Sequence, residues 1–123
     1  DLAVVDANHP AERIARASVT GRLIRLPGLD LPRVIGAILR VLPLDVSEPD
    51  PIRAMIDANE PGRTPEVHGA VLQEINRGLD QPMAFGAIER FAFYESAKRS
   101  FGVVQVGDIR SFGCFLIRKG TIN

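Results

Sequence analysis

Residues 1–10 read DLAVVDANHP, and this stretch shows the pattern on which the fold is built. The apolar, β-branched run Leu2–Val5 predicts a buried strand, and the polar segment 6–10 that follows it predicts a turn. Similar runs that also predict strands occur at residues 21–26, 52–56, 103–106 and 114–117. We therefore expect a sheet made of several short strands.

Helical patterns lie between these runs. Asp30 is a good N-cap residue, Pro32 is tolerated in a first helical turn, and apolar residues then recur at i, i+3 and i+4 spacing up to Pro43. Further helices are predicted at residues 11–17 (one or two turns), 65–78 (with Gly78 as its C-cap) and 88–101. Strands and helices thus alternate along the chain.

This alternation indicates an α/β fold, with three layers in the order α/β/α and a mixed, largely parallel sheet covered on both faces. The loops are too short to separate domains, so residues 1–123 are expected to form a single domain. Because the chain starts inside an apolar run, we expect the domain's N-terminal segment to lie upstream of Asp1. A processed protein with a short leader is the alternative.

The composition excludes several classes of protein. With 15 Lys+Arg and 15 Asp+Glu the formal net charge is zero, which argues against nucleic acid as a partner because phosphate binding needs clustered positive charge. A single cysteine cannot form an internal disulfide, and this favours a reducing compartment, the cytoplasm. No apolar run approaches the roughly 20 residues needed to cross a bilayer, so we expect no membrane association.

Common motifs for cofactors and metals are absent from the sequence. It contains no G-x-G-x-x-G after a strand, no phosphate-binding G-x-x-x-x-G-K-[ST] and no G-x-S-x-G. Its two histidines and one cysteine do not have the spacing of a zinc site. We therefore expect neither a cofactor nor a metal, and we interpret Cys114, which lies in an apolar run, as a small buried hydrophobic residue.

Two candidate site residues follow the first predicted strand. Asp6 lies where open α/β sheets bind ligands, so its carboxylate can hold a sugar hydroxyl or act as an acid or base. Alternatively, Asp6 caps the turn through its own side chain. His9, three residues later, is as compatible with a surface loop as with a functional role.

Two further candidates lie in the second half of the chain. In a helix, Arg90 and Tyr94 lie one turn apart on one face, where a guanidinium and a phenol can bind a polyhydroxylated ligand together. In residues 111–114, SFGC, the glycine lets a ligand approach the backbone and Phe112 offers a flat apolar surface, although an ordinary turn before a strand explains the segment equally well. We expect Phe91 and Phe93 to be core residues and His68 to be a surface residue.

Two of these segments resemble a known family. Residues 88–95, IERFAFYE, and residues 111–120, SFGCFLIRKG, closely resemble the C-terminal half of the RbsD/FucU family of L-fucose mutarotases and D-ribose pyranases. The turn at residues 6–10 resembles the family's D-A-x-F-P turn, and residues 42–45, LPLD, resemble a stretch after its first long helix. The resemblance covers the whole chain, and it is closer to the fucose branch than to the ribose branch.

The resemblance implies specific roles for residues of this chain. Asp6 matches the family's sugar-binding aspartate, Arg90 matches a sugar-binding residue, and Tyr94 matches the tyrosine of the R-F-A-F-Y-E block. The segment that closes over the sugar corresponds to Phe112, Gly113 and Cys114. The family's catalytic histidine belongs to a G-H-G-D sequence, which would fall just before Asp1.

Three positions depart from the family pattern. Phe112 replaces a tyrosine and Cys114 an asparagine, so two hydrogen-bonding groups are lost, whereas His9 replaces a phenylalanine and adds a polar group. Polar substrate groups left unpaired are costly, so these changes bear on which sugar is bound.

The implied activity is the interconversion of the α and β anomers of a free monosaccharide, L-fucose in the fucose branch, by general acid–base ring opening. Neither a metal nor a nucleotide is needed for it. The resemblance also implies a homo-oligomer, often a decamer, with a monosaccharide as ligand. A non-catalytic sugar-binding protein, a D-ribose pyranase-type enzyme and a structural oligomer without a pocket are the alternatives.

Overall fold

The five predicted runs and one further strand form a six-stranded sheet in the computed structural model, which describes residues 1–47, 49–77 and 81–120. Its strands are β1 (Leu2–Val5), β2 (Leu23–Leu26), β3 (Ile52–Met55), β4 (Gly86–Ile88), β5 (Val103–Val106) and β6 (Cys114–Ile117). They lie in the order β2-β5-β1-β6-β3-β4. Only β6 runs antiparallel to its neighbours, β1 and β3, so the sheet is mixed and largely parallel, as predicted.

Four helices cover this sheet: α1 (Ala11–Ala17), α2 (Leu31–Val41), α3 (Glu66–Ile75) and α4 (Arg90–Lys98). The N-cap prediction for α2 is confirmed, because the side chain of Asp30 accepts a hydrogen bond of 3.0 Å from the backbone N–H of Arg33. Among the described residues, no helix is both long and apolar enough to cross a membrane.

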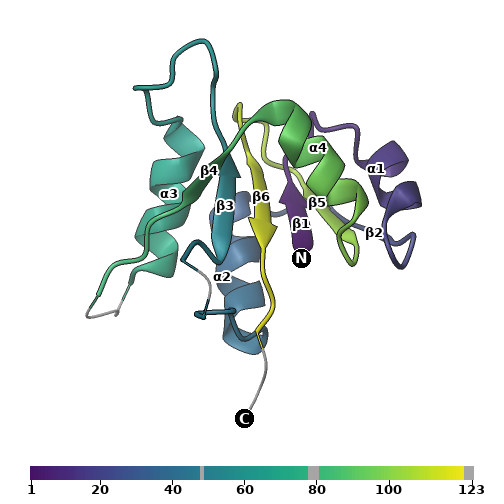
Figure 1. Ribbon diagram of the computed structural model, residues 1–123, viewed down its shortest axis with the longest axis horizontal. Coiled ribbons are helices and arrows are strands. Elements are labelled where there is room, and N and C mark those ends of the chain that lie inside the picture. Colours follow the sequence, from purple (N-terminus) through teal and green to yellow (C-terminus); the bar gives the residue numbers. More distant parts are fainter. Residues whose placement is uncertain (48, 78–80, 121–123) are drawn as a thin grey trace.

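The helices lie in two layers, one on each face of the sheet (Figure 1). Alternate residues of a strand point to opposite faces, so Ala3 and Val5 of β1 pack with α1 and α4, whereas Val4 packs with α2 and α3. In β6, Cys114 and Leu116 join the first cluster, and Phe115 and Ile117 join the second. The three-layer α/β/α prediction is therefore confirmed.

Some predicted elements differ from the structure. The strand β4 was expected to be part of a loop and of the helix that follows, because three residues are too few to show a strand period. Helix α4 begins two residues later than expected, at Arg90, because the side chain of Glu89 caps it by accepting from two backbone N–H groups. Helix α3 ends at Ile75, and the predicted C-cap Gly78 lies outside the described residues.

The strand directions bring several chain segments to one edge of the sheet. Strands β1, β3 and β4 all end there, and antiparallel β6 begins there, since Val5 at the end of β1 pairs with Cys114 at the start of β6. Helix α4 also begins at this edge, directly after β4. The predicted site residues come from these same segments.

Candidate functional site

A pocket of about 210 Å³ opens at this edge of the sheet. Its lining residues are Asp6, Asn8, His9, Met55, Arg90, Tyr94, Ser111, Phe112 and Cys114. Of the predicted site residues, Gly113 alone is not part of this lining. The pocket is smaller than the roughly 300–1,000 Å³ typical of sites for drug-sized molecules, and its size suits a smaller ligand.

Asp6 is buried at the end of β1 and holds two backbone N–H groups. One carboxylate oxygen accepts from Asn8 at 2.9 Å, and the other accepts from Gly113 at 3.0 Å. Burial raises the pKa of Asp6 above its ordinary value, although these hydrogen bonds act in the opposite direction. Each carboxylate oxygen has two acceptor sites, so Asp6 can cap the turn and still accept a hydrogen bond from a ligand. The turn-capping interpretation is therefore confirmed, and the ligand-binding interpretation stays a prediction.

The peptide bond between Phe112 and Gly113 is held from two sides. Its N–H donates to Asp6, and its carbonyl oxygen lies 2.9 Å from Nε2 of His68, in α3. Phe112 has a φ of 63°, in the left-handed region that costs a residue with a side chain about 1–2 kcal/mol. A strained residue of this kind persists only where its surroundings hold it firmly.

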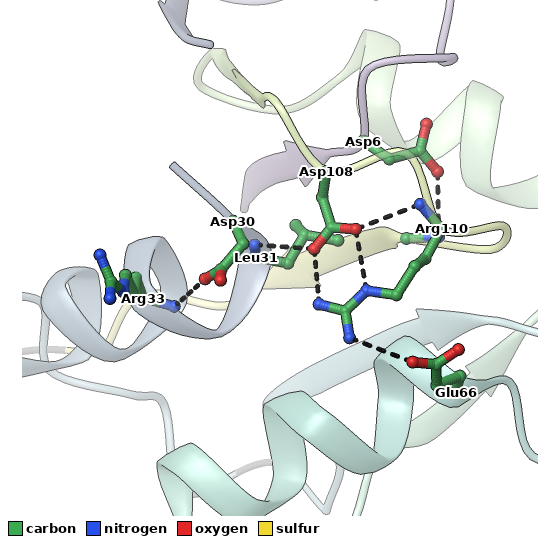
Figure 2. A network of polar contacts seen from close by, with 8 residues as sticks. Asp6, Asp30, Leu31, Arg33, Glu66, Asp108 and Arg110 are labelled. Carbon is green, nitrogen blue, oxygen red and sulfur yellow. Dashed lines mark hydrogen bonds and ion pairs between the residues drawn. The ribbon is translucent and has the colours of Figure 1, made fainter. Parts of the chain in front are cut away.

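A second set of contacts fixes the rest of this loop. Figure 2 shows the carboxylate of Asp108, which accepts from the backbone N–H of Leu31 at the start of α2 and from the guanidinium of Arg110. On its other side this guanidinium lies 3.7 Å from the carboxylate of Glu66 in α3. The hydrogen bonds from Arg110 hold the pKa of Asp108 down, at about 2. The loop after β5 is thus tied to α2, to α3 and to β1.

His9 and Cys114 meet in the buried part of the pocket. The His9 ring is only 7% exposed, and its Nδ1 lies 3.6 Å from the sulfur of Cys114. Its Nε2 is buried without a hydrogen-bond partner among the described residues. Burial lowers the pKa of His9 to about 4, and burial together with the nearby Asp6 raises the pKa of the Cys114 thiol. His9 is therefore neutral at pH 7, and Cys114 is a protonated, buried thiol, as predicted.

Arg90 and Tyr94 contribute to the pocket from one face of α4, as their spacing predicts. Tyr94 is partly buried, with its ring centroid 5.3 Å from that of His9. Arg90 is exposed, and it forms no ion pair with any part of the chain that the structure describes. Its guanidinium is therefore available to a ligand in the pocket.

Sequence reasoning was wrong about two aromatic side chains. Phe93 is fully buried, as predicted, but Phe91, also expected in the core, is 70% exposed. His68 was expected on the surface and is only 5% exposed. A signal for His68 did exist, because it precedes Val71, Leu72 and Ile75 of the apolar face by three, four and seven residues. The pair Asp108–Arg110 was also missed, and it has no comparable pattern.

These groups can bind an uncharged, hydroxyl-rich molecule and exchange protons with it. A buried carboxylate, a guanidinium and a phenol surround the pocket, and the ring of Phe112 offers an apolar wall. Within residues 1–47, 49–77 and 81–120, no group of three or more His, Cys, Asp or Glu side chains is placed to hold a metal ion.

Comparison with known proteins identifies the family of this chain. A profile described as the RbsD / FucU transport protein family matches residues 1–122. The chain belongs to the RbsD/FucU family. The fucose mutarotase of Mus musculus is 33% identical over 129 residues, which cover 100% of this chain and 80% of the mouse protein. The family prediction made from the sequence is thus confirmed.

Solved structures give the same assignment. The crystal structure of the protein Atu2016 is 36% identical, has a TM-score of 0.91, and the match covers 99% of this chain and 81% of that protein. FucU from Bifidobacterium longum is 28% identical, with a TM-score of 0.86 and coverage of 99% of this chain and 84% of the other. The predicted RbsD-like fold is therefore confirmed.

His9 gives this RbsD/FucU protein a pH-dependent stability that can be measured. The pKa of His9 is near 6.5 in the unfolded chain and about 4 in the folded chain. The stability that the neutral His9 contributes is therefore fully present above pH 6.5 and is lost as the pH falls toward 4. We expect wild type to lose about 3 kcal/mol more than His9→Phe between pH 7 and pH 4, as measured by urea unfolding. Equal losses in the two proteins would contradict the buried, neutral state of His9.

Proposed function

We propose that the protein is an L-fucose mutarotase, which interconverts the α and β anomers of the free sugar. The observation that carries this proposal is one small pocket in which the buried carboxylate of Asp6 and the free guanidinium of Arg90 are brought together. The similarity to the mouse fucose mutarotase supports the choice of L-fucose. A monosaccharide is uncharged, so a chain with zero net charge needs no electrostatic field to attract it.

The chemistry requires only proton transfer. The anomeric hydroxyl loses a proton, the ring oxygen gains one, and the ring C–O bond opens to the free aldehyde. Rotation about the bond to the carbonyl carbon and closure on its other face then give the second anomer, with both protons returned. General acid–base groups contribute roughly 10²–10⁴-fold to such a step.

We assign the following roles to residues of this chain. Asp6 holds a sugar hydroxyl or orients the acid–base group, and its raised pKa makes it a stronger proton acceptor than an exposed aspartate. Arg90 donates to a second hydroxyl. The segment Phe112–Cys114 lines the pocket, with the Phe112 ring against the apolar face of the sugar.

We propose that the protein forms a homo-oligomer, as the resemblance to the RbsD/FucU family implies. We further propose that the enzyme acts in the cytoplasm, which the free Cys114 thiol supports.

The test is saturation-transfer NMR between the anomeric protons of the free sugar, with the full-length protein at catalytic concentration. We expect faster exchange for L-fucose than without protein, and less acceleration for D-ribose. Faster anomer exchange for D-ribose alone would identify a pyranase-type enzyme instead. No effect on any free sugar would refute the proposal and leave a structural oligomer.

A second candidate, a sugar-binding protein without catalysis, is favoured by one observation. Phe112 and Cys114 line the pocket where the resemblance implies tyrosine and asparagine, so two groups that could hold the sugar in a reactive geometry are absent. In the same experiment this alternative predicts line broadening of the sugar signals without transfer between anomers.

A further inference from the structure

We propose that His68 is a positioning residue of the sugar site, which acts by locking the peptide bond between Phe112 and Gly113 in one orientation. This inference rests on the proposed function, because it concerns the same pocket. His68 does not line that pocket, so its side chain does not contact a ligand bound there. Its effect must pass through the backbone that it holds.

The first step of the argument is the geometry of the peptide bond. The carbonyl of Phe112 faces His68, with 2.9 Å between the oxygen and Nε2, and the N–H of Gly113 faces Asp6, with 3.0 Å between nitrogen and Oδ2. A carbonyl oxygen can only accept, so Nε2 of His68 carries the proton and donates it. One peptide unit thus connects a helix on one side to the proposed catalytic carboxylate on the other.

The second step is that backbone strain at Phe112 favours a turn of this peptide unit. Phe112 lies in the left-handed region, with a φ of 63°, which a side chain disfavours. Relaxation of Phe112 to a more common region changes its φ and ψ, and this turns the peptide unit that follows it. Gly113 has no Cβ, so its own φ can follow such a turn. The turn would point the Gly113 N–H away from Asp6. The two hydrogen bonds at its ends are what oppose it.

The third step is the surroundings of His68. Its ring packs edge to face against both Phe85 and Phe115, with centroid distances of 6.0 Å and 5.4 Å, so the donor is held by packing as well as by helix α3. Burial lowers the pKa of His68, which keeps the ring neutral at neutral pH. A partly buried carbonyl that lost this donor would be left without a protein partner, and that is costly.

The fourth step links this orientation to the site. Phe112 lines not only the pocket of Asp6 but also two neighbouring hollows, of about 430 Å³ and about 240 Å³. Its ring is therefore a wall that all three share. A change in the backbone at Phe112 would redirect this ring, alter the pocket that receives the sugar, and remove one hydrogen bond from Asp6.

Two substitutions and a control test the proposal. His68→Phe keeps a ring packed against Phe85 and Phe115 but cannot donate, whereas His68→Gln places an amide N–H near the position of Nε2. The control Asn76→Leu acts at the far end of α3, where the Asn76 side chain bonds the backbone of Met83 at 3.1 Å and 2.7 Å. It removes side-chain–backbone hydrogen bonds from the same helix without touching the pocket.

The first readout is the kinetics of anomer exchange in the full-length protein. We expect His68→Phe to raise KM for L-fucose about tenfold, with a smaller fall in kcat, because a factor of this size is within the range that loss of a hydrogen bond to a partly buried carbonyl costs. His68→Gln should restore most of the loss, and Asn76→Leu should keep the wild-type KM even where it lowers stability. A wild-type KM in His68→Phe, or equal impairment in His68→Gln, would overturn the proposal.

The second readout does not depend on catalysis. Hydrogen exchange of the Gly113 amide, followed by NMR, should become about tenfold faster in His68→Phe, whereas the amides of Val4 and Val5 in β1 should keep their wild-type rates. If the wild-type protein proves inactive on every sugar, the proposed function fails while this measurement still decides the role of His68. An unchanged Gly113 amide would refute that role.

Discussion

Replacement of Asp6 by asparagine is expected to reduce the rate of L-fucose anomer exchange at least about 100-fold, as measured by NMR. The substitution conserves size but removes the negative charge, and with it the carboxylate that we assign to the sugar site. It also turns one accepting oxygen into an N–H₂ group, which then faces either the N–H of Asn8 or that of Gly113. Asp6→Asn therefore removes the carboxylate charge and also one of the two hydrogen bonds that hold the loop at this position.

A matched control for this change is Asp45→Asn. Asp45 is partly buried, and its Oδ1 accepts from the backbone N–H of Ser47 at 3.2 Å, the same i to i+2 turn that Asp6 makes with Asn8. The control therefore changes an equivalent turn away from the pocket, and its activity should stay within about twofold of wild type. Full activity in a folded Asp6→Asn protein would show that the site has been placed wrongly.

Replacement of Gly107 by alanine is expected to cause the largest loss of stability. A Cβ at this position would lie 1.9 Å from the backbone oxygen of Pro27 and 2.8 Å from its carbonyl carbon. The backbone cannot move aside easily, because the N–H of Gly107 donates to the carbonyl of Leu29 at 2.9 Å in the same turn. Overpacking costs typically 1–3 kcal/mol, and a clash with backbone belongs at the upper end, so we expect about 3 kcal/mol.

The measurement is urea unfolding, supported by the melting temperature, which should fall by about 10 °C. Gly28→Ala is the control, since Gly28 lies beside Pro27 in the facing turn but a Cβ there would meet no atom within 4 Å. That variant should keep wild-type stability. Equal stability of the Gly107→Ala and Gly28→Ala proteins would contradict the close approach of the two turns. Because Gly107 precedes Asp108, its substitution should also loosen the loop that carries Arg110 and Phe112.

Much of the fold could be predicted because its signals are local. The run Leu2–Val5, the cap at Asp30 and the apolar period of α2 each depend on neighbours a few residues away, and all three agree with the structure. The i, i+4 spacing of Arg90 and Tyr94 placed both side chains at the pocket for the same reason. Strand β4 was missed because three residues are too few to show the alternation of a strand. Its pairing with β3 depends on the assembled sheet and not on its own residues.

The sequence alone determined the family, the α/β class and most of the residues that surround the pocket, because these depend on residue identity and short-range spacing. Only the tertiary structure decided how these residues are held in place. Asp6 and Gly113 are separated by 107 positions in the sequence, and His68 and Phe112 by 44, yet both pairs are joined by hydrogen bonds. Such contacts leave no local pattern, because they arise when β6 inserts antiparallel beside β1 and brings the loop before it against α3. Side chains far apart in the sequence thus come to hold a single peptide bond.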